Sequence, residues 1–106
     1  MKNPLKILII DDEESFALVL SLDLKSSEHF DTTVANSGEA GIEILKKEKM
    51  DVVLLDYHLG TMNGLQVMQW MNENKIDTPV VLLTGAGTEE IAVEAMKLGA
   101  YDYSRK

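Results

Sequence analysis

The chain has 106 residues, of which 45% are hydrophobic and 26% charged, and its formal net charge is −8. This length accommodates a single hydrophobic core, so we expect one domain over residues 1–106. The negative charge argues against direct binding to nucleic acid or to an anionic membrane, because both require basic residues. The sequence contains no cysteine, which excludes disulfides and thiolate chemistry. The start of the chain does not resemble a signal peptide, and we expect a cytoplasmic protein.

Short apolar runs alternate with longer amphipathic segments along the chain. Runs rich in Ile, Val and Leu are typical of strands that are buried on both faces of a parallel sheet. The predicted strands are 6–10, 32–35, 52–56, 80–83 and 101–104, and the predicted helices are 14–26, 38–48, 65–74 and 89–98. This alternation indicates an α/β domain with helices on both faces of the sheet.

Local signals support several of these helices. The first has an apolar stripe that repeats every four residues, formed by Phe16, Leu20 and Leu24 with Val19 and Asp23 between them. Ser37 is suited to cap the start of the second helix. Gly99 follows the fourth helix, where a left-handed residue commonly ends a helix.

Polar side chains stand at or near the ends of four of the five predicted strands. They are Asp11, Asp12, Asp56, Thr84 and Lys106. In parallel sheets of this kind, functional groups collect at the carboxyl edge of the strands. We therefore expect three carboxylates, a hydroxyl and an ammonium group at one edge, as a site for a divalent metal and a phosphoryl group.

The three carboxylates have alternative explanations when each is taken alone. Asp11 and Asp12 are equally typical of a helix start, and Asp56 of a loop. Together they would repel one another, since two unit charges about 4 Å apart cost roughly 4 kcal/mol at an effective dielectric near 20. Mg²⁺ would remove that repulsion. A zinc site is disfavoured, because the sequence has no cysteine and only two histidines, His29 and His58.

Thr84 and Lys106 would complete such a site. A lysine supplies a positive charge to phosphoryl oxygens, and a neighbouring hydroxyl can donate a hydrogen bond to them. Taken alone, Thr84 is equally typical of an ordinary strand residue. Lys106 is equally typical of a solvated lysine at a chain end.

Four motifs together resemble the receiver domain of two-component response regulators over nearly the whole chain. They are the Asp11-Asp12 pair, LLDYHLGTMNGLQV around Asp56, LLTG ending on Thr84-Gly85, and GAYDYSRK ending on Lys106. The resemblance implies a flavodoxin-like, doubly wound parallel sheet of five strands in the order 2-1-3-4-5. This order is a property of the family and does not follow from the spacing of the strands.

The resemblance also implies a role for each acidic residue. Asp56 would be the phosphoacceptor, taking a phosphoryl group from a phosphohistidine of a sensor histidine kinase. Asp12 would bind Mg²⁺ directly and Asp11 mostly through water. Asp56 and the backbone carbonyl of His58 would be further ligands.

The remaining implied roles concern the switch between states. Lys106 would neutralise the transferring group, and Thr84 would move to hydrogen-bond the acyl phosphate. Tyr103 matches a switch aromatic that turns inward as Thr84 moves. The output would be an effector domain C-terminal to this chain or a separate protein partner, with no turnover of an external substrate.

The sequence departs from the family pattern in two places. Gly60 stands where proline is usual, and we expect a modest loss of stability and no loss of chemistry. Family members also continue beyond the lysine with a fifth helix. Without that helix, we expect exposed apolar surface on strands one, three and five, and association through that face, including dimerisation.

Two other classes of protein remain open from the residues. A metal-dependent phosphatase with an aspartate nucleophile usually has its two acids two residues apart after the first strand, whereas Asp11 and Asp12 are adjacent. A phosphate-independent interaction module would keep the fold and lose the switch. The intact set of Asp56, Thr84 and Lys106 argues against it.

Overall fold

The computed structural model describes residues 3–85 and 89–106 of the chain. Its strands are β1 (Leu5–Ile10), β2 (Phe30–Ala35), β3 (Val52–Asp56), β4 (Val80–Thr84) and β5 (Asp102–Arg105). Its helices are α1 (Glu14–Lys25), α2 (Gly38–Lys47), α3 (Gly64–Glu73) and α4 (Glu89–Lys97). Every predicted element is confirmed. Among the described helices, none is long and apolar enough to cross a membrane.

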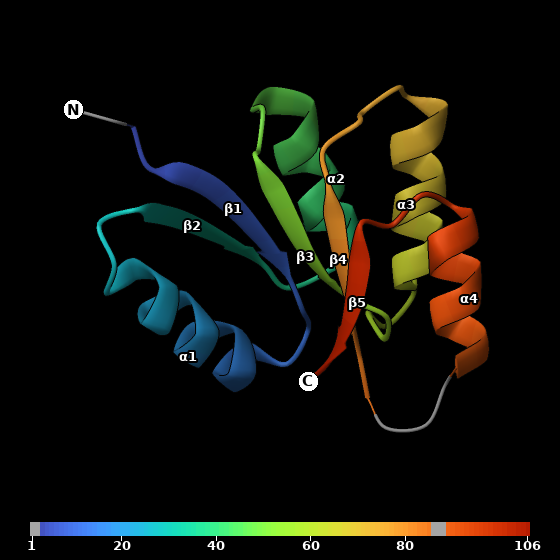
Figure 1. Ribbon diagram of the computed structural model, residues 1–106, viewed down its shortest axis with the longest axis horizontal. Coiled ribbons are helices and arrows are strands. Elements are labelled where there is room, and N and C mark those ends of the chain that lie inside the picture. Colours follow the sequence, from blue (N-terminus) through green and yellow to red (C-terminus); the bar gives the residue numbers. More distant parts are fainter. Residues whose placement is uncertain (1–2, 86–88) are drawn as a thin grey trace.

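The strands form one parallel sheet in the order β2-β1-β3-β4-β5, as the resemblance implied. Helix α1 packs on one face of the sheet, and α2, α3 and α4 pack on the other (Figure 1). Successive residues of each strand point to opposite faces, so β1 serves both cores. Leu8 and Ile10 belong to the core under α2, α3 and α4, while Ile7 and Ile9 belong to the core under α1.

Helix α1 differs in part from its predicted stripe. Leu20 and Leu24 pack against the sheet as expected, but the placement of Val19 beside them was wrong, because this side chain is 59% exposed. The buried face contains Ala17 and Ser21 instead. Small residues there let the helix lie close to the edge strand β2, and the position of Val19 on the helix surface then turns it outward.

A buried polar pair fastens α1 to β2. The hydroxyls of Ser21 and Thr32 lie 2.6 Å apart, and both side chains are buried. Each hydroxyl therefore satisfies the other in a region that water does not reach. The pair fixes the position of α1 along the edge of the sheet.

The ends of the helices follow the expected local chemistry. The backbone N–H of Ala40 donates to Ser37 Oγ at 3.0 Å, which confirms the cap of α2. Gly99 has φ +98°, the left-handed conformation expected after α4. Helix α3 begins with a capping box that the sequence analysis did not predict, in which Asn63 and Gln66 each accept a hydrogen bond from the other's backbone N–H.

The face of the sheet beside α1 is less apolar than predicted. On strand one the predicted exposed apolar surface is confined to Leu5, which is 48% exposed, and strand five is polar on this face. Ile7 and Ile9 of β1 are only 6% and 0% exposed, because α1 covers them. On the same face β5 places Asp102 and Ser104, which pair with Val81 and Leu83 of β4. The half-buried apolar residues on this face lie on β3 and β4, and they are Val52, Leu54 and Val81.

Candidate functional site

The ends of four strands meet at the carboxyl edge of the sheet. Asp11 follows β1 and its backbone N–H donates to the carbonyl of Ala35 at 2.9 Å, which extends the β1–β2 ladder. Asp56 is the last residue of β3. Lys106 follows β5, and its backbone N–H donates to the carbonyl of Thr84 at 2.9 Å. Regular strand pairing therefore brings together residues that lie up to 95 positions apart in the chain.

Lys106 bridges three carboxylates. Its Nζ lies 2.6 Å from Glu13 Oε1, 3.1 Å from Asp11 Oδ2 and 3.4 Å from Asp56 Oδ2. Burial on its own would lower the pKa of Lys106, but the hydrogen bonds that it donates to Glu13 and Asp11 and the charge of Asp56 raise it above its ordinary value. These partners therefore favour the charged ammonium.

Asp56 is a buried carboxylate with a perturbed pKa. It is 3% exposed. Burial raises its pKa most, the neighbouring charge of Asp11 raises it further, and Lys106 lowers it, with a net value of about 6. One lysine thus compensates only part of the cost of placing two carboxylates side by side.

The acidic residues fit a hard divalent cation. Oxygens of Asp11, Asp12 and Asp56 lie within 4.8 Å of one another. Asp11 is 0% exposed, and its Oδ1 accepts the backbone N–H of Glu13 at 2.9 Å. Among the described residues, its buried Oδ2 has no hydrogen-bond partner, because the nearby Lys106 ammonium is not aligned with it. A buried oxygen without a partner is costly, and a cluster of carboxylate oxygens is what Mg²⁺ prefers.

The cluster opens into a polar cleft. The cleft has a volume of about 520 Å³ and is lined by Asp12, Glu13, Asp56, His58, Gly85 and Lys106. The side chain of His58 is exposed, and its ring contacts the edge of Tyr57. The cleft gives a solvent-borne or partner-borne group direct access to Asp56.

The two residues assigned to the switch lie beside this cleft and not in it. Thr84 is 6% exposed, and the described hydrogen bonds link it to the cluster only through its backbone. Tyr103 is 50% exposed and pairs with Leu82, so its ring is on the α4 side of β5. There it lines a separate groove with Val93 and Met96 of α4.

The loop after Asp56 is held by close backbone packing. The N–H of Gly64 donates to the carbonyl of Tyr57 at 2.8 Å, and a Cβ on Gly64 would lie 2.7 Å from the carbonyl oxygen of Asp56. Gly60 has φ +78°, a conformation closed to proline, whose ring fixes φ near about −65°. The glycine at this position therefore allows a backbone conformation that proline could not adopt.

Two residues at the site were not predicted as functional. Glu13 was not singled out in the sequence, and Phe16 was assigned only to the apolar stripe of the first helix. Glu13 makes the shortest contact to Lys106, and the ammonium lies 4.7 Å from the centre of the Phe16 ring. Their spacing is the sequence signal that places Glu13 and Phe16 side by side, because residues three apart share one face of the first turn of a helix.

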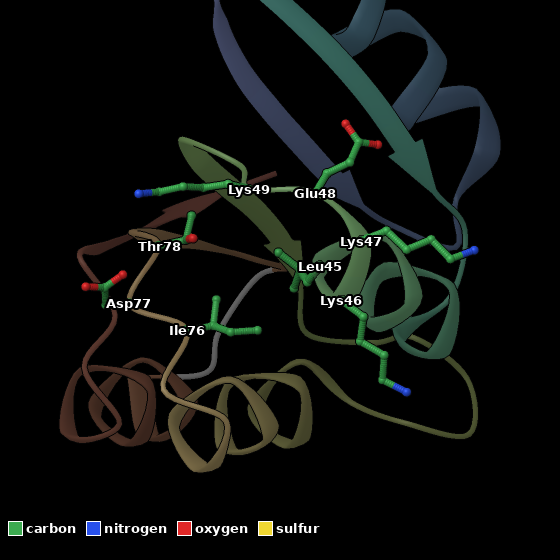
Figure 2. Close-up of a pocket in the computed structure, with 8 residues that line it drawn as sticks. All are labelled: Leu45, Lys46, Lys47, Glu48, Lys49, Ile76, Asp77 and Thr78. Atoms are coloured by element: carbon green, nitrogen blue, oxygen red, sulfur yellow. The ribbon is translucent and has the colours of Figure 1, made fainter.

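A second groove lies at the opposite edge of the sheet, between the end of α2 and the start of β4. It has a volume of about 320 Å³, and Lys46, Lys47 and Lys49 stand at its rim. Figure 2 shows that these three lysines point away from one another. Lys46 is paired with Glu43 at 3.1 Å. The lysines do not converge on one point, so the groove lacks the charge arrangement of an anion site.

The fold and the site together define a flavodoxin-like α/β domain with an acidic, lysine-bridged pocket at the carboxyl edge of its sheet. The profile of the family described as "Response regulator receiver domain" matches residues 7–106. The chain belongs to this family, whose members are signalling modules rather than true enzymes.

Two curated relatives show the same similarity. Regulatory protein AtoC of Escherichia coli is 36% identical over 98 residues, covering 92% of this chain and 21% of AtoC. The alkaline phosphatase synthesis transcriptional regulatory protein PhoP of Bacillus subtilis is 35% identical over 101 residues, covering 95% of this chain and 42% of PhoP. The chain thus spans less than half the length of either relative.

Solved structures agree with this assignment. The receiver domain of the Francisella response regulator 1452 superposes with a TM-score of 0.89 at 28% identity, covering 98% of this chain and 84% of that one. A response regulator from Burkholderia pseudomallei, solved with a phosphorylated aspartic acid, calcium ion and citrate, gives 0.87 at 29% identity. That match covers 96% of this chain and 59% of that one.

Proposed function

We propose that this domain accepts a phosphoryl group on Asp56 from a phosphohistidine of a sensor histidine kinase. The observation that carries the proposal is the convergence of Asp11, Asp56 and Lys106, with both carboxylates within 3.4 Å of one ammonium at the mouth of a cleft. The phosphorylated aspartic acid of the Burkholderia pseudomallei relative supports it.

The proposed reaction is an in-line displacement at phosphorus. A carboxylate oxygen of Asp56 attacks the phosphorus, the P–N bond of the phosphohistidine breaks, and the imidazole leaves with the bonding electron pair and takes up a proton. The product is an acyl phosphate on Asp56. Lys106 neutralises charge on the phosphoryl oxygens, and Thr84 donates a hydrogen bond to them once it has moved.

The residues that would hold Mg²⁺ are Asp11, Asp12, Asp56 and the backbone carbonyl of His58. The bound cation would neutralise negative charge that one lysine cannot balance. Asp11 contributes most to this fit, since its buried Oδ2 pairs with the charge of Lys106 but accepts no hydrogen bond from the residues that the structure describes. The calcium ion in the Burkholderia pseudomallei relative is consistent with a divalent site in the family.

We assign the response to Thr84 and Tyr103. An acyl phosphate adds strong acceptors within reach of Thr84, and this local change biases a two-state arrangement of α4 and β5. Tyr103 is half exposed and lines a groove beside α4, and its ring would turn inward as Thr84 moves. The output would be an effector domain or a protein partner in the cytoplasm, with dimerisation as one route.

Intact-mass measurement tests the proposal. The protein is incubated with Mg²⁺ and a small acyl phosphate donor, beside Asp56→Asn and the control Asp77→Asn, which removes an exposed acid outside the cleft. We expect one added phosphoryl group on the wild type and on the control. Asp56→Asn and a chelated sample should show none.

Other outcomes identify the alternative classes. Steady release of phosphate from an ester substrate would indicate an aspartate-dependent phosphatase. No adduct together with no Mg²⁺ binding would indicate a phosphate-independent interaction module and would overturn the proposal.

A further inference from the structure

Lys106 is held more closely by Glu13 than by the residue it would serve. The distance from its Nζ is 2.6 Å to Glu13 Oε1 and 3.4 Å to Asp56 Oδ2. The first is a short, charge-assisted hydrogen bond, whereas the second is at the limit of hydrogen bonding. The lysine therefore rests on the first turn of α1 in this structure.

Glu13 is itself held in place by the acidic cluster. Its backbone N–H donates to Asp11 Oδ1 at 2.9 Å, and its carbonyl accepts the N–H of Ala17 at 3.0 Å at the start of α1. Phe16, three residues on, places its ring 4.7 Å from the ammonium. The resting place of the lysine is thus built from a fixed backbone, a carboxylate and an aromatic face.

We propose that Glu13 is a positioning residue that competes with the phosphoryl group on Asp56 for Lys106. The inference rests on the proposed function and adds a residue that sets how readily Asp56 is phosphorylated. An ammonium has three N–H donors, and Lys106 directs them to Asp11, Glu13 and Asp56, with by far the shortest bond to Glu13. When Asp56 carries a phosphoryl group, Lys106 serves it fully only after loosening its bond to Glu13.

Loss of the Glu13 bond should favour the phosphorylated state. Glu13 is 60% exposed, so its bond to Lys106 is of the modest, partly solvated kind. We expect the rate of phosphorylation by a small acyl phosphate and the affinity for beryllium trifluoride, a phosphoryl mimic, to rise about two- to five-fold.

Three variants separate the loss of this bond from a general change in charge. Glu13→Gln removes the charge and weakens the bond. Glu13→Asp keeps the charge but is one methylene shorter, so its carboxylate cannot keep the 2.6 Å contact. Glu14→Gln is the matched control, because Glu14 is an exposed neighbour with no described contact to Lys106. If competition for the lysine is correct, Glu13→Gln and Glu13→Asp both show the rise and Glu14→Gln does not.

Two results would overturn the proposal. In the first, Glu13→Asp is phosphorylated at the wild-type rate, while the rate rises in both Glu13→Gln and Glu14→Gln. That result would mean that these acids only repel the anionic donor. The other is unchanged kinetics in all three variants.

A metal-free NMR measurement keeps this test independent of phosphorylation. We expect the ¹H–¹⁵N signal of the Lys106 ammonium group to move in both Glu13 variants and to stay in place in Glu14→Gln. If the wild type is not phosphorylated at all, the proposed function fails and the claimed competition fails with it. If the wild type is phosphorylated and the ammonium signal is the same in all variants, the positioning role of Glu13 alone is refuted.

Discussion

Replacing Gly64 by alanine should displace the strand end that carries Asp56. A Cβ at this position would lie 2.7 Å from the carbonyl oxygen of Asp56 and 3.1 Å from the Cα of Tyr57. Both are backbone atoms, so no side-chain rotation relieves the overlap. Overpacking of this kind costs about 1–3 kcal/mol. We expect a loss of about 2 kcal/mol in the free energy of unfolding, which lowers the melting temperature by about 8–16 °C in a domain of this size.

Thermal unfolding followed by circular dichroism measures this effect, and a second alanine variant supplies the control. At Gly85 an added Cβ meets nothing within 4 Å, so Gly85→Ala should leave the melting temperature nearly unchanged. The phosphoryl adduct on Asp56 should also form more slowly in Gly64→Ala than in the wild type. Equal melting temperatures for the two variants would refute the close approach of α3 to β3.

Three further effects follow from buried or capping groups. Ser21→Ala leaves the buried Thr32 hydroxyl without its partner and should lower the free energy of unfolding in urea by about 1–2 kcal/mol. The double variant Ser21→Ala/Thr32→Val should recover most of this loss, and no recovery would show that the pair is not the cause. Asn63→Ala removes the cap of α3 and should cost about 1 kcal/mol, so an unchanged urea midpoint would contradict the capping box. In chelator, the pKa of Asp56 is about 6 in the folded state, above its ordinary value of about 4. Between these two values the folded wild type binds a proton that the unfolded chain does not. The stability of the wild type relative to Asp56→Asn should therefore fall by up to about 3 kcal/mol as pH rises from about 4 to 6, and Mg²⁺ should reduce the fall. A stability difference that does not vary with pH would argue against the raised pKa.

The elements of the fold could be predicted because their signals are local and strong. Apolar runs such as the one that becomes β3 are buried on both faces, and they leave little choice of structure. The cap at Ser37 and the left-handed Gly99 mark helix ends through backbone chemistry that neighbouring residues determine. The strand order came from the family resemblance, because spacing alone does not specify which strands pair.

The errors arose where packing between elements decides the outcome. Val19 fits an apolar stripe by spacing, but the small Ala17 and Ser21 define the face that packs on the sheet. The exposure of the strands depended on how far α1 reaches over Ile9, which no local pattern indicates. Glu13 was missed for a related reason, since its contact at the site is with a lysine 93 residues away.

The charge around Lys106 has a consequence for the kinetics of encounter. Four carboxylates, from Asp11, Asp12, Glu13 and Asp56, surround one ammonium that pairs with three of them, in a chain of net charge −8. A small anionic donor approaches against this field, and added salt should speed its association by screening the repulsion. A protein donor with a basic docking surface is attracted by the same field, and added salt should slow it. The direction in which salt changes the association rate therefore reports the sign of the charge on the surface that a donor presents to the cleft.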